Sequence, residues 1–104
     1  MAAELFVKFE NINWYIENKK MIINVITSLE TFVYQLNNEF WLKDSSDIID
    51  DDYHVRIFLN NDDIMLEIDF HPFDIEKSLK NFLNWIRMNT NIIVQDEDGE
   101  ISTW

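Results

Sequence analysis

The strongest constraint on the fold of this chain is an alternation of apolar and polar side chains within residues 53–71. Two runs alternate, His54–Leu59 and Ile64–Phe70, and the polar residues Asn60–Asp63 separate them. Because Asn and Asp tolerate the left-handed backbone of a tight turn, the pattern predicts a β-hairpin. One face would carry Val55, Ile57, Leu59, Ile64, Leu66, Ile68 and Phe70. The other face would carry Arg56, Phe58, Met65, Glu67, Asp69 and His71.

Apolar residues at spacings of three and four predict two helices outside this hairpin. The first is expected over Lys19–Trp41, and a break near Asn18 separates it from an ambiguous segment at residues 11–18. Its apolar stripe would consist of Ile22, Val25, Ile26, Leu29, Phe32, Val33, Leu36 and Phe40. The second helix follows Pro72 and is expected to run from Asp74 to Asn89. Its stripe would consist of Ile75, Leu79, Phe82, Leu83 and Ile86.

Short runs at residues 4–9 and 92–94 predict two further strands, and Asp98-Gly99 predicts a turn into an edge strand at residues 100–104. The resulting order is β-α-β-β-α-β, with the last strand additional, and this is the order of the ferredoxin-like split βαβ arrangement. We therefore expect a single α+β domain over residues 1–104. Its sheet would be mostly antiparallel, with the helices packed on one face.

The formal net charge of −12 at pH 7 restricts the partners that this chain would bind. Direct binding to nucleic acid or to an anionic membrane needs Lys and Arg, so neither is expected. The sequence has no cysteine and no apolar run of membrane-spanning length. It also lacks the pattern of a signal peptide. We therefore expect a cytoplasmic protein, bacterial in style, whose natural partner is a basic protein.

The acidic residues are concentrated between Asp44 and Glu76, where eleven acids accompany one base, Arg56. Residues 77–91 carry Lys77, Lys80 and Arg87 and no acid. This segregation of sign predicts a binding face with acids for electrostatic steering and aromatic anchors beside them. The expected partner-binding acids are Asp44, Asp47, Asp50, Asp51, Asp52, Asp62 and Asp63. The expected anchors are Tyr53 and Trp41.

A metal site or a catalytic site is a less well supported interpretation of the same acidic residues. Glu67, Asp69 and His71 project from one strand face and have the side chains of a divalent cation site. An exposed strand face with Arg56 paired to Glu67 or Asp69 explains them better. The chain has one glycine, so it lacks a phosphate-cradling loop, and Ser45 and Ser46 lie among aspartates that would oppose an oxyanion. We expect neither enzyme activity nor a metal or cofactor.

In its small size, acidity, lack of cysteine and acid-rich loop at Asp44–Asp52, the chain resembles the immunity proteins of bacterial contact-dependent inhibition and related polymorphic toxin systems. The resemblance implies an inhibitor that binds a cognate basic toxin, often a nuclease or RNase, and blocks its active site. It implies a one-to-one complex, and we expect a free protein that is a monomer or a weak dimer. The alternatives are a nucleic-acid mimic that occupies a DNA-binding protein and, with less support, a small metal-binding protein.

Overall fold

The hairpin expected at residues 53–71 lies at the centre of the sheet in the computed structural model, which describes residues 2–45 and 52–104. Its strands are β4 (Val55–Leu59) and β5 (Asp63–Ile68), and they pair from Val55↔Ile68 to Leu59↔Ile64. The Tyr15 hydroxyl contacts the backbone carbonyl oxygens of Asn60 (2.6 Å) and Asp63 (3.0 Å). The turn is therefore tied to the helical layer as well as to its own strands.

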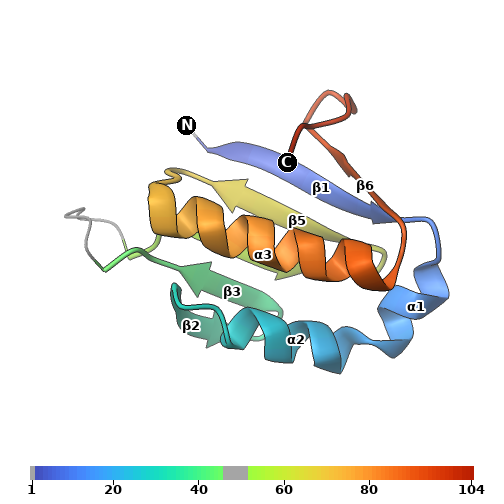
Figure 1. Ribbon diagram of the computed structural model, residues 1–104, viewed down its shortest axis with the longest axis horizontal. Coiled ribbons are helices and arrows are strands. Elements are labelled where there is room, and N and C mark those ends of the chain that lie inside the picture. Colours follow the sequence, from blue (N-terminus) through green and yellow to red (C-terminus); the bar gives the residue numbers. More distant parts are fainter. Residues whose placement is uncertain (1, 46–51) are drawn as a thin grey trace.

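The described residues form a six-stranded antiparallel sheet in the order β2-β3-β4-β5-β1-β6, together with three helices (Figure 1). The other strands are β1 (Ala3–Phe9), β2 (Phe32–Leu36), β3 (Glu39–Leu42) and β6 (Ile92–Gln95). The helices are α1 (Ile12–Glu17), α2 (Lys19–Thr27) and α3 (Phe73–Asn89). The prediction of an α+β domain with an antiparallel sheet and helices on one face is confirmed.

The connections of β4, β5, β1 and β6 follow the split βαβ pattern. The strand β1 lies between β5 and β6, which α3 connects, and β5 lies between β1 and β4. The predicted element order is incomplete, however, because the hairpin β2–β3 comes between α2 and β4 and extends the sheet beyond β4.

The single helix predicted over Lys19–Trp41 is wrong in its second half. The helix α2 ends at Thr27, and the hydroxyl groups of Thr27 and Ser28 donate back to carbonyl oxygens one turn earlier. Residues 31–34, Thr-Phe-Val-Tyr, are all β-branched or aromatic, which favours a strand. Asn37 adopts a positive φ of 56° in the turn between β2 and β3. A two-residue Asn37-Asn38 turn therefore reverses the chain where the helical stripe would have continued.

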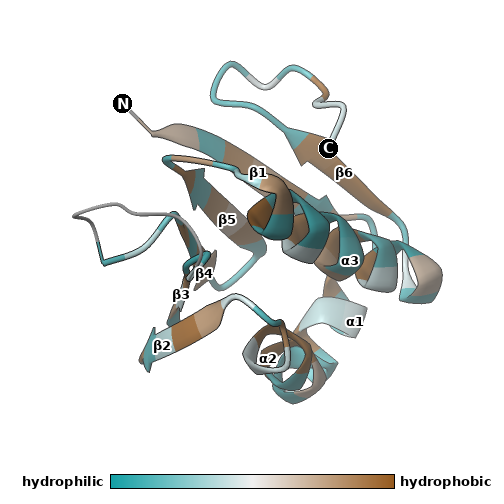
Figure 2. Cartoon of the chain, turned by 60° about the vertical axis from the view of Figure 1, so that its left-hand side comes forward, coloured by the Kyte–Doolittle hydropathy of each residue, from teal (hydrophilic) through white to brown (hydrophobic). Residues whose placement is uncertain are grey.

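One face of the sheet is covered by α2 and α3, which lie on the same side of it (Figures 1 and 2). The side chains of this covered face are apolar and at most 6% exposed: Leu5, Val7, Phe40, Leu42, Val55, Ile57, Leu59, Ile64, Leu66, Ile68 and Val94. The helices contribute Tyr15, Ile22, Ile26, Ile75, Leu79, Phe82, Leu83 and Ile86 to the same core. The predicted stripe of α3 is thus confirmed in full. Phe70 differs from its prediction, because it follows the end of β5 and is 48% exposed.

The C-terminal segment lies against the outer side of β6. The turn at Asp98-Gly99 is confirmed, with Gly99 at a φ of 81°, but the expected edge strand is reduced to one bridge between Gln95 and Ile101. Within the described residues, no helix combines the length and the apolar character that crossing a membrane requires.

Candidate binding surface on the open face of the sheet

The face of the sheet opposite the core, here called the open face, carries a mixture of rings and charges. None of the described helices lies on this side (Figures 1 and 2). The cross-strand register aligns Tyr34, Trp41, Arg56 and Glu67 in one row over β2, β3, β4 and β5. A second row consists of Leu36, Glu39, Phe58, Met65 and Phe6. Strand alternation therefore gives one sheet an apolar side and a polar, ring-rich side.

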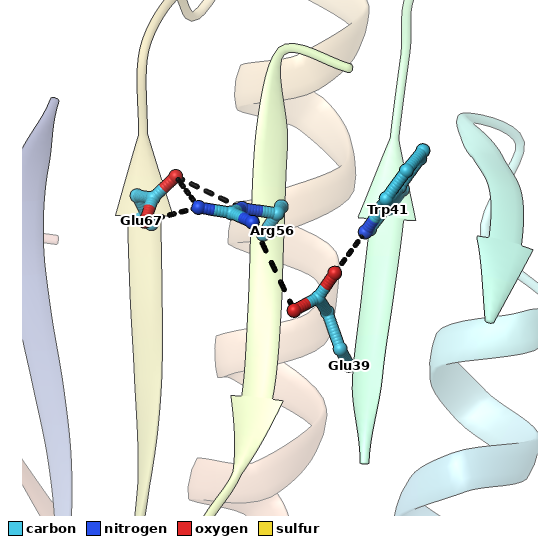
Figure 3. Close-up of polar contacts among 4 residues, drawn as sticks. All are labelled: Glu39, Trp41, Arg56 and Glu67. Atoms are coloured by element: carbon cyan, nitrogen blue, oxygen red, sulfur yellow. Dashed lines mark hydrogen bonds and ion pairs between the residues drawn. The ribbon is translucent and has the colours of Figure 1, made fainter. Parts of the chain in front are cut away.

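Arg56 is the centre of the polar network on the open face (Figure 3). Its Nη2 atom donates to both carboxylate oxygens of Glu67, at 2.7 and 2.8 Å, and its Nε atom donates to Glu67 Oε1 at 2.9 Å. Glu39 Oε1 lies 3.8 Å from Arg56 Nη1, and Glu39 Oε2 accepts a hydrogen bond from Trp41 Nε1 at 2.5 Å. One guanidinium thus joins carboxylates from the two neighbouring strands. The predicted pairing of Arg56 with Glu67 is confirmed.

Aromatic rings surround this network. The guanidinium carbon of Arg56 lies 4.7 Å from the ring centre of Tyr53 and 5.2 Å from that of Phe58, so the charge is held between π faces. The ring of Trp41 lies 5.1 Å from Tyr53 and 4.7 Å from Tyr34. We call Tyr34, Trp41 and Tyr53 the aromatic cluster. It extends from the centre of the open face to the edge strand β2.

The environment of the open face keeps Arg56 charged and Tyr53 neutral. Burial alone would lower the pKa of Arg56, but the hydrogen bond and the negative charge of Glu67 outweigh it, and the pKa is raised. Burial also raises the pKa of Tyr53; Arg56 opposes this rise, and the charges of Glu67, Asp69 and Glu39 add to it. Arg56 therefore stays protonated and Tyr53 stays neutral through the physiological pH range.

The structure separates the predicted binding residues into groups. Trp41 and Tyr53 lie on the open face and contact one another. Asp52 and Asp62 are exposed at opposite ends of β4. Asp63 is already engaged, because its carboxylate accepts from Lys8 Nζ at 2.6 Å and from Asn60 Nδ2 at 2.9 Å.

Asp44 lies in a different environment from the exposed acids. It is only 6% exposed, and its backbone N–H donates to Nδ1 of the fully buried His54 at 3.1 Å. Asp44 therefore does not belong to the accessible acidic surface. The predicted sites Asp47, Asp50 and Asp51 lie outside the described residues.

Sequence reasoning missed Tyr34 and Glu39 as parts of this surface. Both residues lie in the segment for which the sequence predicts a helix. A helix would not pair Tyr34 with Trp41 or Glu39 with Phe58, as the strands do. The Asn37-Asn38 dipeptide between two runs rich in aromatic residues was the available indication of a hairpin.

The outer side of the helical layer has the opposite charge character. Five of the eight basic residues of the chain belong to α2 and α3, namely Lys19, Lys20, Lys77, Lys80 and Arg87. Acidic and basic residues, which the sequence separates within residues 44–91, are therefore also separated in space. The basic residues are concentrated on the helices.

The alternative metal site is not assembled in the described residues. Glu67 is held by Arg56, and His71 Nδ1 lies 2.8 Å from Glu76 Oε1. Across the described ranges, no three His, Cys, Asp or Glu side chains are grouped so that they could hold an ion.

No protein-family model matches this sequence, and neither a curated protein nor a solved structure gives a significant match to the chain. Its function is therefore inferred from its own residues.

Proposed function

We propose that this chain is an inhibitory binding protein that neutralises a cationic protein by forming a one-to-one complex through the open face of its sheet. The observation that carries the proposal is the aromatic cluster with the Arg56–Glu67–Glu39 network, on a sheet face that no described helix covers. The resemblance to polymorphic-toxin immunity proteins suggests the class of partner, a basic toxin that acts on nucleic acid. We also propose that the protein acts in the cytoplasm and that it has no enzymatic activity of its own.

Two physical properties support binding of a cation at this face. The net charge of −12 would attract a basic partner over long distances and raise its association rate by roughly 10- to 1,000-fold. Aromatic and Arg side chains at the centre of a polar surface are the usual anchors of an interface. The open face supplies both kinds of anchor, in Tyr53, Trp41, Phe58 and Arg56.

The contacts of Arg56 support the binding of a cation at this face. The guanidinium of Arg56 is held by two rings and two carboxylates of the same face. A basic side chain of a partner would meet the same chemistry beside it. Exposed acids spaced like phosphates would favour a nucleic-acid mimic, whereas Glu39 and Glu67 have side chains that are 18% and 16% exposed and share Arg56.

The test begins with capture of the partner. The tagged protein is incubated at low salt with lysate of the source organism and, separately, with the co-expressed product of the adjacent upstream gene, and bound proteins are eluted by salt. We expect one basic protein, whose enzymatic activity falls to zero at one equivalent of the inhibitor. Elution of a DNA-binding protein that duplex DNA displaces would instead indicate the nucleic-acid mimic. An empty capture under both conditions would contradict the proposal.

A matched pair of double variants tests the electrostatic part with the captured partner. Asp52→Asn with Asp62→Asn removes two exposed charges at the ends of β4, whereas Asp98→Asn with Glu100→Gln removes two exposed charges near the C-terminus. Stopped-flow association at low salt should slow for the first pair by more than for the second. Equal slowing would show that only the total charge matters, and that the charges near the open face have no special role.

A further inference from the structure

The two edges of the sheet differ in what lies beside them. At the β6 edge, the C-terminal segment is hydrogen-bonded to the strand: Ser102 N–H donates to Val94 O at 2.8 Å, and Asp96 N–H donates to Glu100 O at 2.8 Å. The bridge between Gln95 and Ile101 belongs to the same cover. The C-terminal segment therefore occupies this edge from Val94 to Asp96.

The β2 edge is open among the described residues, since no described strand pairs with its outer side. Its side chains are exposed although several are large and apolar: Val33 is 51% exposed, Tyr34 45% and Leu36 50%. No charged residue occurs from Thr31 to Asn38, and no proline interrupts the strand. Charged side chains and prolines are two of the devices by which proteins prevent edge pairing, and β2 lacks both, so its regular part is open to an added strand although β2 is short and irregular between Phe32 and Tyr34.

The hydrogen-bond register shows which backbone groups of β2 face outward. Leu59 N–H donates to Asn38 O at 2.9 Å, which fixes the positions of β3 that bond to β4. Because antiparallel pairs alternate, Tyr34 and Leu36 turn their N–H and C=O groups toward β3. Gln35, between them, turns its N–H and C=O to the outer side, where a new strand would bond.

We propose that the outer edge of β2 accepts an extended, basic segment of the partner protein as an added strand, with its basic side chains against Tyr34 and Glu39. This inference rests on the proposed function, and it specifies where and in what form the cationic partner binds. Addition of a strand to a sheet edge is an established mode of recognition, in which main-chain bonds supply affinity and alternate side chains supply specificity.

The net charge of −12 complements a basic segment, and the rings of Tyr34 and Trp41 can accept a cation, so together they favour a basic segment as the occupant. Tyr34 and Trp41 present rings on the open face beside β2, and Glu39 lies opposite Leu36 in the adjacent strand. Across the described residues, no Lys or Arg lies over the rings of Tyr34 or Trp41, in contrast to Arg56 over Tyr53. A second copy of this chain would carry the same net charge of −12 and would be repelled at low salt.

Because the regular part of the β2 edge is short, side-chain contacts must contribute to the affinity for an added strand. The register of β2 with β3 shifts between Phe32 and Tyr34, so the regular part of the edge spans only Tyr34–Leu36. Few main-chain hydrogen bonds are available over this length. The side-chain contacts with Tyr34 are therefore expected to contribute a large share of the affinity.

The experiment uses the full chain and defined peptides as probes. The first peptide is an acetylated and amidated octamer of alternating Arg and Val; the second has the same sequence with alternate backbone nitrogens methylated; the third has Gln in place of Arg. Affinity is measured by calorimetry at low salt, and amide protection in β2 is measured by NMR.

Two variants of the protein test the β2 edge. Tyr34→Ala removes the ring, and Gln35→Pro removes the outward N–H of the backbone. Ile93→Ala, an exposed apolar residue of β6, is the matched control.

The first peptide should bind and should slow exchange of the Gln35 amide, and methylation should abolish this protection. Tyr34→Ala should weaken binding by about three- to thirtyfold, the range of a cation–π contact. Gln35→Pro should weaken it as well, and Ile93→Ala should leave it unchanged.

Several results would overturn the inference. Unchanged affinity in both β2 variants, or failure of the basic peptide to bind while the captured protein partner still binds, would overturn the edge site and leave the proposed function intact. Equal binding of the Gln peptide would overturn the preference for a basic segment. Salt-promoted self-association that protects the Gln35 amide would identify a second copy of the chain as the occupant. Loss of binding to every cationic probe, protein or peptide, would overturn the proposed function together with the edge site.

Discussion

The two faces of the sheet are made by alternate residues of the same strands, yet they differ in almost every physical property. On β4, Val55, Ile57 and Leu59 are at most 6% exposed and pack under the helices, whereas Arg56 and Phe58 between them stay partly exposed. The covered face buries apolar area, which is the main source of folding free energy. The open face holds a partly buried ion pair, which contributes little to stability in general.

This difference indicates that the two faces meet different requirements. A sheet that needed only stability would carry simple polar side chains on its second face, because antiparallel sheets commonly expose one side to water. Here the second face instead carries an ordered arrangement of rings and paired charges. We propose that this arrangement is pre-organised for contact with another molecule, since pre-organisation reduces the entropy lost on binding.

The largest contrast should appear between neighbouring residues of β4. Ile57→Ala would leave a cavity in the covered face, and we expect it to lower the free energy of unfolding by about 3 kcal/mol. Phe58→Ala on the open face should cost only about 1 kcal/mol, because its ring is partly exposed. Urea denaturation of both variants measures the difference. Equal losses would show that the open face also acts as a core.

The ion pair provides a smaller and sharper test. Arg56→Met would leave Glu67 and Glu39 without their shared cation, and we expect a loss of about 1–2 kcal/mol, between the values for exposed and buried pairs. Adding Glu67→Met should recover part of this loss, with a coupling energy of about 1 kcal/mol in the double-mutant cycle. Strictly additive losses would mean that the two side chains act independently.

The smallest effect is expected at Tyr15, which ties the helical layer to the hairpin turn. Tyr15→Phe removes the hydroxyl contacts to Asn60 and Asp63 and should cost about 1 kcal/mol at neutral pH. Burial, followed by the negative charges of Asp63 and Asp62, raises the pKa of Tyr15 in the folded protein. The unfolded chain therefore loses this proton first, and wild-type stability should fall as the pH rises above about 10.

The Tyr15→Phe variant lacks that proton, so the stability difference between the two proteins should narrow above about pH 10. Urea denaturation of both proteins at neutral and alkaline pH measures the difference. A constant difference across the range would contradict the assignment of the alkaline loss to Tyr15.

The central hairpin and α3 could be predicted from sequence because their periodicities match only one kind of element each. The alternation at residues 54–70 fits a strand, and the stripe from Ile75 to Ile86 fits a helix. The hairpin β2–β3 could not be separated from a helix by apolar spacing alone. Val33 and Leu36 extend the helical stripe of Ile22 and Ile26, but they are half exposed on the edge strand.

The sequence predicted only those contacts of the candidate site that depend on pairing between the two strands of one hairpin. The contact between Arg56 and Glu67 followed from the hairpin register, and it is confirmed. The burial of Asp44 against His54 and the position of Glu39 beside Arg56 depend on how β3 packs against β4. Acidic residues appear equivalent in a sequence, whereas packing distinguishes the buried Asp44 from the exposed Asp52.

We propose that the open face, and not the helical layer, contacts the partner. Hydroxyl-radical footprinting of the complex with the captured protein tests it directly, since both layers carry oxidisable side chains. Tyr34, Trp41, Phe58 and Met65 report on the open face, and Phe73 and Met88, 78% and 82% exposed, report on the helical side. We predict that binding reduces oxidation of the first group and leaves the second unchanged. Protection of Phe73 and Met88 with unchanged oxidation of the open face would contradict the claim.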